Sequence, residues 1–148
     1  MNCQSLPQIS VRNLQRTSRV NAAVLERFAT KAVRHCLQVR KRKQTDLREL
    51  RDIFVWLISG RRMARLHRQF LGKTSPTDVL TFQHGEIFIS VDMAKRQAHM
   101  FGNSLMRELQ LYIVHGFLHL HEFDDRTPSG ARTMKRMQEK ILSRVLSR

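Results

Sequence analysis

The residues best suited to chemistry in this sequence are two histidines four positions apart, His115 and His119, followed six positions later by Asp125. On an α-helix, residues four apart lie one above the other, so both imidazoles can face one metal ion. Asp125 comes after the expected helix end, where a chain that turns back brings its carboxylate to the same ion. The extended zinc-protease motif has the same spacing of six. Since two imidazoles and one carboxylate leave a fourth position open, as in catalytic zinc sites, we predict one Zn²⁺ per chain.

Alternatives to this ligand set lie in the same stretch of chain. Histidines at this spacing also occur as packed core residues. His121 and Asp124 are rival ligands, although His121 is expected to point away from the predicted ligand face and Asp124 requires a turn in another register. Glu122 is the candidate proton carrier, and an ordinary exposed turn residue is its alternative reading.

Gly116 argues against proteolysis. It stands where zinc proteases of the HExxH type carry their glutamate base, so HGFLH lacks the proton carrier for peptide hydrolysis. A glycine inside a helix costs about 1 kcal/mol relative to alanine. We therefore expect Gly116 to let another backbone or a substrate come close to the helix.

Three further polar residues are expected to have at most a supporting role at the metal site. Glu108 lies seven residues before His115, about 10 Å along a helix, which is too far for direct contact with the metal. His84 sits in a short connection from which it could approach the metal cleft, but a lone loop histidine is usually solvated. Asp78 is expected to hold a turn and the start of a strand.

The elements that must position the metal ligands follow from hydrophobic periodicity. An apolar helix over residues 104–120, begun by Ser104, is expected to carry both histidines at its end. Asn21, Asp92 and Gly72 are expected to cap other helices. Strands are predicted over residues 8–14, 52–59, 77–82 and 85–90, and further helices over residues 22–39, 61–71, 92–100 and 134–145.

This pattern predicts an α+β fold in one domain, residues 1–148. A small mixed four-stranded sheet would pack with about five helices, with residues 52–59 as a central strand and residues 77–82 and 85–90 as an antiparallel pair. The metal site would lie at the end of a long buried helix.

Composition bounds the class of protein. The 148 residues include 41% hydrophobic residues, enough for one core, and the two cysteines, Cys3 and Cys36, have no CxxC spacing. No stretch is long and apolar enough for a signal peptide or a membrane span. We expect a cytoplasmic protein without a membrane partner.

The charge indicates a polyanionic partner. The net charge is +15, of which residues 1–72 carry +12 and residues 73–148 carry +3. Nucleic acid is the obvious polyanion, and a generally solvated basic surface or attraction to a membrane surface is the alternative. A basic loop is expected at residues 40–43. The residues predicted to contact RNA lie on and after the basic second helix: Arg61, Arg65, Arg68 and Lys73.

Two separated motifs resemble the YbeY family of metal-dependent endoribonucleases, also called ribosomal RNA maturation factors. The family signature, approximately HGxLHLxGYDH, corresponds to HGFLHLHEFDD at residues 115–125. The second element, approximately PTDVLSFP followed by GDIxIS, corresponds to PTDVLTF at residues 76–82 and GEIFIS at residues 85–90. The Arg12-Asn13-Leu14-Gln15 segment also fits, so the resemblance covers most of the chain.

The chain departs from the family pattern at four positions. Asp125 replaces the third histidine, Glu122 the turn glycine and Phe123 the tyrosine, while Leu71 stands where the family carries an arginine. An aspartate ligand makes the metal a weaker Lewis acid, so we expect activity to require higher pH or another metal. The arginine's role does not transfer, and Arg68 or Lys73 are the residues that could replace it.

The resemblance implies a single-strand-specific, metal-dependent endoribonuclease that acts on ribosomal RNA, at the 3′ end of 16S rRNA, and works with the ribosome in quality control. Charge and spacing alone imply a metal hydrolase acting on a polyanion. The alternative is a non-catalytic ribosome- or RNA-binding assembly factor with a structural metal. A metalloprotease or another small-molecule metal hydrolase comes third.

Overall fold

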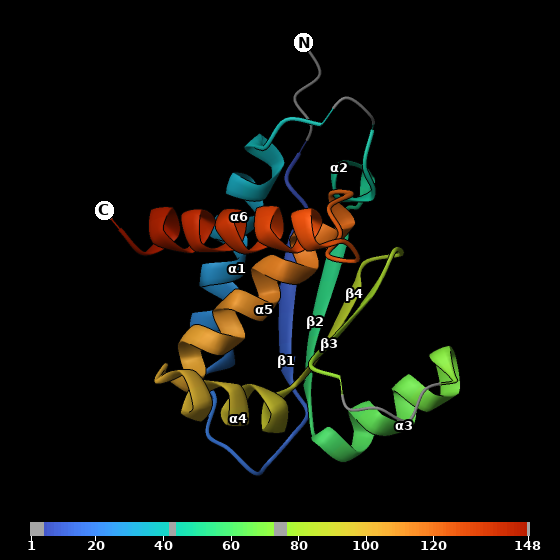
Figure 1. Ribbon diagram of the computed structural model, residues 1–148, viewed down its shortest axis with the longest axis vertical. Helices are drawn as coiled ribbons and strands as arrows, with labels where there is room; N and C mark the ends of the chain where they lie inside the picture. Colours follow the sequence, from blue (N-terminus) through green and yellow to red (C-terminus); the bar gives the residue numbers. More distant parts are fainter. Residues whose placement is uncertain (1–4, 42–43, 73–76, 148) are drawn as a thin grey trace.

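A four-stranded mixed sheet carries helices on both of its faces in this computed structural model, which describes residues 5–41, 44–72 and 77–147. Helices α1, α4, α5 and α6 pack with one face, and α3 covers the end of the other (Figure 1). The elements are β1 (Gln8–Asn13), α1 (Ala22–Gln38), α2 (Asp46–Glu49), β2 (Asp52–Ile58), α3 (Gly60–Leu71), β3 (Val79–Phe82), β4 (Glu86–Ser90), α4 (Val91–Phe101), α5 (Leu105–Leu120) and α6 (Pro128–Leu146).

The strands lie in the order β1-β2-β4-β3. The pairs β1/β2 and β2/β4 are parallel, and β3/β4 is an antiparallel hairpin. Val11 lies beside Val55, and Val55 beside Ile87, so the inward residues of three strands form one apolar layer. The predicted α+β class, the central position of β2 and the β3/β4 hairpin are confirmed.

Helix α5 lies within the main core, in contact with the sheet, α1, α4 and α6. Its buried apolar side chains surround most of its circumference, which suits a helix covered on several sides. No helix in the described ranges is both long and apolar enough to cross a membrane.

Gly116 is the point of closest approach between α5 and the sheet. A Cβ atom built there would lie 2.8 Å from Cδ1 and 3.0 Å from Cγ2 of Ile87 on β4. The close neighbour is therefore an isoleucine side chain, and the glycine serves helix–sheet packing. The expected close approach to the helix is present, and the neighbouring group is a side chain instead of a backbone.

The outward residues of the sheet form a second, smaller apolar cluster. Ile58 of β2 packs there with Met63 of α3, and partly buried aromatic side chains lie against them. Trp56 and Phe88, on neighbouring strands, stack with ring centroids 6.4 Å apart. The aromatic character of β2 thus comes from this outer layer.

Helix ends confirm most of the predicted caps and correct one. Asn21 and Ser104 accept hydrogen bonds at the starts of α1 and α5, and Gly72 ends α3 in the left-handed conformation. The start of α4 is capped by Ser90, whose hydroxyl accepts from the Met93 N–H. The predicted cap there, an aspartate two residues later, was wrong.

Two local features were not predicted from the sequence. Asp92, the expected cap, accepts the Gly60 N–H at 2.7 Å and so ties α4 to the start of α3. The short helix α2 begins after Thr45, whose hydroxyl accepts from Arg48 N–H. In the predicted basic loop at residues 40–43, Arg40 is exposed, and the last two positions lie outside the described residues.

The contact between Gly116 and Ile87 predicts a measurable packing coupling. Gly116→Val should lower the free energy of unfolding by about 1–3 kcal/mol because the added methyl groups meet a filled layer. Urea denaturation measures this. The double variant Gly116→Ala/Ile87→Ala should be more stable than the sum of the single effects predicts; strictly additive effects would contradict the close contact.

The buried thiol of Cys36 predicts a pH effect. Burial raises the pKa of Cys36 well above its usual range, because desolvation disfavours the thiolate. The thiol should therefore stay unreactive toward a disulfide reagent between about pH 7 and about pH 9, and react on unfolding. The stabilisation that the buried, protonated Cys36 thiol contributes is fully present below the pKa of about 8.5 of a cysteine in the unfolded chain. This stabilisation is lost progressively as the pH rises above that value.

A Cys3→Ser background keeps the thiol assay specific, since Cys3 lies outside the described residues. Rapid labelling of this variant under native conditions would contradict the burial of Cys36.

Candidate metal centre

His115 and His119 project from the last turns of α5. Their Nε2 atoms lie 2.9 Å apart, and their rings meet edge to face with centroids separated by 4.5 Å. Both side chains are partly exposed, at 23% and 29%. The helical spacing therefore brings the two imidazoles to one point, where they remain reachable from solvent.

The turn after α5 brings the chain back toward these histidines. Glu122 adopts the left-handed conformation, with φ of 66°, that ends helices in a Schellman motif. Its N–H donates to the His119 carbonyl, and the Phe123 N–H donates to the Leu118 carbonyl at 3.0 Å. Lys41 secures the turn, because its ammonium donates to the Glu122 carbonyl and lies 3.9 Å from the Phe123 ring centroid.

Asp125 completes a three-donor cluster. Its carboxylate oxygens lie 3.7 Å from Nε2 of His115 and 3.8 Å from Nε2 of His119. Tetrahedral ligands with bonds of about 2.0–2.2 Å to zinc are separated by about 3.3–3.5 Å. The separation of 2.9 Å between the two histidine nitrogens lies below this range, and the two histidine–aspartate separations lie above it. The residues therefore fit a zinc ion with small adjustments of their side chains.

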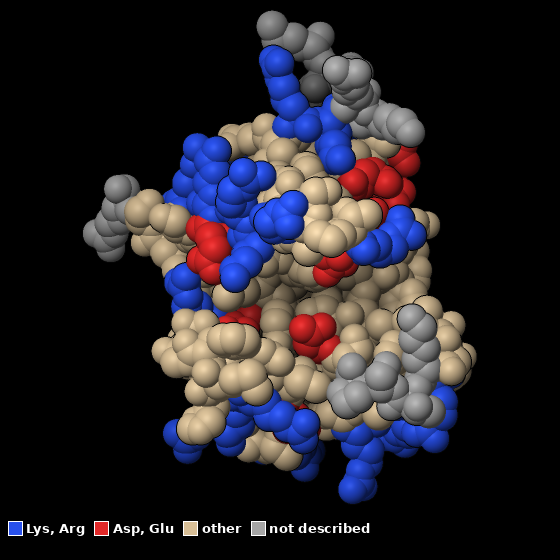
Figure 2. Space-filling view, viewed as in Figure 1, with Lys and Arg blue, Asp and Glu red and all other residues tan. Residues whose placement is uncertain are grey.

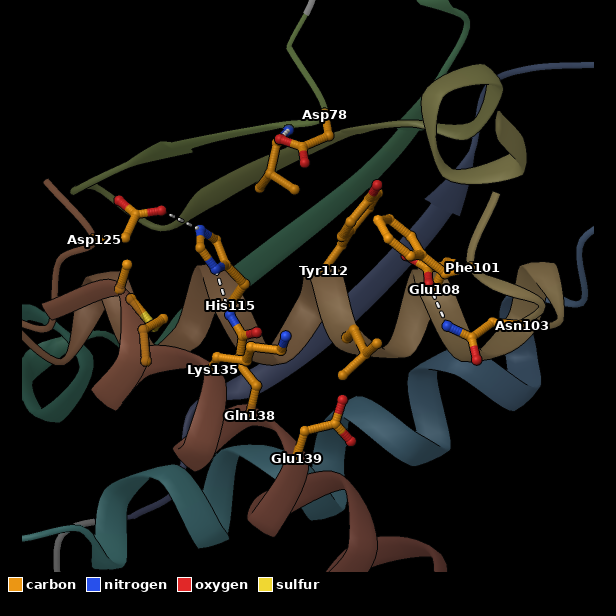
Figure 3. Close-up of a pocket in the computed structure, with 14 residues that line it drawn as sticks. Asp78, Phe101, Asn103, Glu108, Tyr112, His115, Asp125, Lys135, Gln138 and Glu139 are labelled. Carbon is orange, nitrogen blue, oxygen red and sulfur yellow. Dashed lines mark hydrogen bonds and ion pairs between the residues drawn. The ribbon is translucent and has the colours of Figure 1, made fainter. Parts of the chain in front are cut away.

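A side chain from α6 holds the ring of His115 from behind. The amide of Gln138 lies within hydrogen-bonding distance of Nδ1 of His115 (Figure 3). When the opposite nitrogen binds a metal, Nδ1 carries the proton and donates it, so the amide must then present its oxygen. Gln138 can satisfy either tautomer by turning its amide.

Burial sets the charge state of His115. Desolvation lowers its pKa most, the neighbouring His119 lowers it further, and Asp125 and Asp78 oppose the shift. The neutral ring is therefore favoured at neutral pH, which leaves a nitrogen lone pair available to a metal.

A cavity of about 460 Å³ lies beside the centre, between α5, α6 and the start of β3 (Figure 3). His115 and Asp125 form one end of it, and Tyr112 and Glu108 on α5 lie farther along. A smaller hollow of about 260 Å³ adjoins both histidines along β3. Figure 2 shows acidic side chains in the hollowed middle of this face, between groups of lysine and arginine above and below.

Comparisons with known proteins give the family of the chain. The family model described as Endoribonuclease YbeY matches residues 10–146 of the chain. The chain belongs to the YbeY family. Among curated relatives named Endoribonuclease YbeY, that of Geobacillus kaustophilus is 38% identical over 112 residues, covering 63% of this chain and 72% of the relative. That of Acholeplasma laidlawii is 33% identical over 108 residues, covering 68% of this chain and 79% of the relative.

A solved structure supports the fold as well. The solution structure of TM1509 from Thermotoga maritima superposes with a TM-score of 0.60 and 25% sequence identity, covering 92% of this chain and 90% of that protein. The fold of this YbeY chain is therefore shared across nearly its whole length.

The two rival ligands lie away from the three-donor cluster. His121 is fully buried, its Nε2 lies 2.7 Å from the Val39 carbonyl and its Nδ1 lies 2.8 Å from the Thr45 hydroxyl. Because a carbonyl only accepts, Nε2 carries the proton and Nδ1 accepts from Thr45. Asp124 instead pairs with Arg126 at 3.1 Å. As expected, His121 points away from the histidine pair.

The remaining acidic and histidine candidates, Glu108, His84 and Glu122, lie outside the three-donor cluster. Glu108 is buried and accepts from the side-chain amide of Asn103 at 2.8 Å, so it supports the cavity wall without reaching the three donors. His84 pairs with Glu86 at the hairpin, 66% exposed. Glu122 is exposed and does not line the cavity beside His115, and its role as a proton carrier stays a prediction.

The predicted RNA contacts lie on another part of the YbeY fold. Arg61, Arg65 and Arg68 are exposed on α3, which Figure 1 shows at the far end of the sheet from the end of α5. Leu71, at the position of the family arginine, is also exposed. Lys73 lies outside the described residues. Contact of these residues with RNA stays a prediction.

The sequence reading missed two residues that matter at the site. Gln138 falls among Met134 and Ile141 on the inward side of α6, and a polar residue in that apolar stripe was the available signal. Tyr112 stands one turn before His115 on α5 and was read as part of the apolar helix.

The buried hydrogen bonds of His121 predict a stability role separate from metal binding. His121→Ala should lower the free energy of unfolding by at least about 2 kcal/mol, because it leaves buried partners unpaired. Zinc stoichiometry at saturating metal should remain one per folded chain. Asp124→Ala, a change at the exposed rival, should alter unfolding by less than about 0.5 kcal/mol. Loss of zinc from folded His121→Ala protein would instead make His121 a ligand.

Proposed function

We propose that this protein is a single-strand-specific endoribonuclease that uses one zinc ion per chain, held by His115, His119 and Asp125. Its substrate would be ribosomal RNA near the 3′ end of 16S rRNA, its partner the ribosome, and its setting the cytoplasm, in rRNA maturation and ribosome quality control. The observation that carries the proposal is the convergence of three metal donors in a solvent-open hollow of a protein with net charge +15. Membership of a family named for endoribonucleases supports the reaction class.

The chain's own residues prepare the site in three ways. Burial keeps His115 neutral, and Gln138 fixes the rotation of its ring. The side chain of Asp125 is 46% exposed, so the centre is open on that side to a bulky polyanion. A zinc ion bound there supplies Lewis-acid chemistry to a phosphodiester. The general base is not assigned; Glu122 is the candidate proton carrier, and an exposed turn residue without a catalytic role is the alternative.

The recessed position of the donors favours unpaired RNA. The histidines stand between β3 and α6 beside a cavity of about 460 Å³, a size typical of sites for small organic groups. A single strand can turn individual nucleotides into such a hollow, whereas stacked, paired bases in a duplex are held in the helix. Basic side chains above and below the hollow can attract the strand (Figure 2).

The direct test compares cleavage of a single-stranded RNA with cleavage of the same sequence in a duplex. Chelation should abolish cleavage and added zinc should restore it. His115→Ala and Asp125→Ala should each slow cleavage by about 100-fold or more, because loss even of a residue that only supports a metal ligand typically costs 10–100-fold. Metal analysis of the same samples shows whether lost cleavage follows lost metal.

Asp124→Ala is the matched control, since it removes an adjacent carboxylate that pairs with Arg126. It should cleave like the wild type. Undiminished cleavage by pure, folded Asp125→Ala protein would remove this residue from the mechanism.

The alternative function is an RNA-binding assembly factor whose metal stabilises the turn after α5. The exposure of Asp125 and the presence of Leu71 in place of an arginine favour it. It predicts salt-sensitive RNA binding that survives chelation, together with loss of thermal stability and absence of metal-dependent cleavage.

A further inference from the structure

The cavity beside the metal centre has a charge opposite to that of the protein as a whole. Asp78, Glu108 and Glu139 line it together with Asp125, and Lys135 is the one lysine or arginine among its described lining residues. The whole chain carries +15. A phosphate group entering this cavity would meet carboxylates, so the ligand that fits is a neutral group that donates hydrogen bonds.

A buried hydroxyl in this cavity has an open hydrogen-bonding capacity. Tyr112 is only 9% exposed, and its hydroxyl has no hydrogen-bond partner among the described residues. Figure 3 shows its ring standing out from α5 with the hydroxyl at the level of Asp78. Burial raises the pKa of Tyr112, and the charges of Asp78 and Glu108 add to this. The hydroxyl therefore stays protonated and able to donate or accept.

The neighbouring carboxylates are held in place but keep free acceptor positions. One oxygen of Asp78 accepts the Val79 N–H, and one oxygen of Glu108 accepts from Asn103. Each carboxylate offers about four acceptor positions, so most remain available. Glu139 is paired with Arg107 across the surface at 2.9 Å and is the least available of the three.

An aromatic ring stands at the cavity wall. Phe101, the last residue of α4, lines the cavity and is 66% exposed. Large apolar side chains this exposed are suited to stack on a flat ligand. Figure 3 shows Phe101 beside Tyr112 and Glu108, so a planar ring lying on Phe101 would turn its polar edge toward the buried hydroxyl and the carboxylates.

We propose that this cavity is a nucleobase subsite, which receives the base of a nucleotide next to the cleaved phosphodiester and prefers bases with an exocyclic amino group. This inference rests on the proposed function, which supplies RNA as the ligand. The hollow on the other side of the histidines suits the sugar–phosphate backbone, because none of its described lining residues is acidic. When an RNA strand lies across the metal centre, its base therefore faces the carboxylates of the cavity and its phosphate faces the histidines.

The acceptor-rich wall sets an order of preference among bases. Guanine presents a ring N–H and an adjacent amino group that one carboxylate can accept together. Adenine and cytosine present an amino group beside a ring acceptor, which the Tyr112 hydroxyl can satisfy. Uracil has no amino group. Guanosine should therefore bind most tightly and uridine most weakly.

Tyr112 is the only tyrosine of the chain, which allows a direct probe. Protein labelled with 3-fluorotyrosine gives one ¹⁹F resonance, located inside the cavity. Titration with guanosine should move this resonance, with at least about tenfold tighter binding than uridine, the effect of one well-placed hydrogen bond. No shift with any nucleoside, or a shift with spermidine or magnesium alone, would overturn the subsite.

Variants test the contacts by two further measurements. Asp78→Asn should reduce the preference for guanosine over uridine about tenfold, while the exposed Asp52→Asn, outside the cavity, should keep it. In cleavage assays, Tyr112→Phe should raise KM for substrates with adenosine or cytidine next to the cleaved bond and so increase the preference for guanosine over these two, with kcat little changed. An unchanged base preference in both cavity variants would contradict the proposal.

The nucleoside titration separates this proposal from the proposed function. Nucleoside binding in a protein that does not cleave RNA would support the subsite and reject the nuclease activity. Metal-dependent cleavage without nucleoside binding or base preference would reject the subsite alone.

Discussion

Helix α5 approaches the sheet at Gly116 so closely that Ile87 fills the space of a side chain. This contact fixes both the distance and the rotation of the helix. Residues next to Gly116 point in other directions around the axis, so the contact decides where His115 and, one turn later, His119 emerge. They emerge between β3 and α6, at the open side of the core. The chemistry of the site depends on a packing constraint in which neither histidine takes part.

The chain after α5 supplies the other half of the site. A Schellman turn reverses the chain at Glu122 and brings Asp125 to the two rings, and α6 then carries Gln138 to the back of His115. Glycine is the residue best suited to the left-handed conformation, and a residue with a Cβ costs about 1–2 kcal/mol there. The contacts of Lys41 with this turn help to offset that cost. The site thus combines rigid helices with one strained and braced turn.

The sequence predicted elements and ligand positions correctly where a local pattern of residues reflects the burial of one face or the geometry of a helix. The short run of β-branched and aromatic residues at 52–59 placed β2 correctly, and the spacing of His115 and His119 placed two imidazoles together. It was weaker where two residues compete for one role: Ser90 and Asp92 can both cap a helix, and only the position of α3 shows that Asp92 is engaged by Gly60. The sequence around Ile87 or Gln138 does not indicate which residue of a distant element each of them contacts. The cavity is a property of several elements together, so periodicity could not reveal it.

The parallel strand pairs have a consequence for the order of folding. Val11 must find Val55, and Val55 must find Ile87, across intervening helices, so the loop-closure entropy of the sheet is high. The contacts of α5 with α6 span a short connection and are entropically cheaper. We therefore expect the three donors to gather in a helical hairpin before the sheet is complete. A metal ion held by these donors would then speed folding as well as slow unfolding, and refolding rates measured with and without added metal test this.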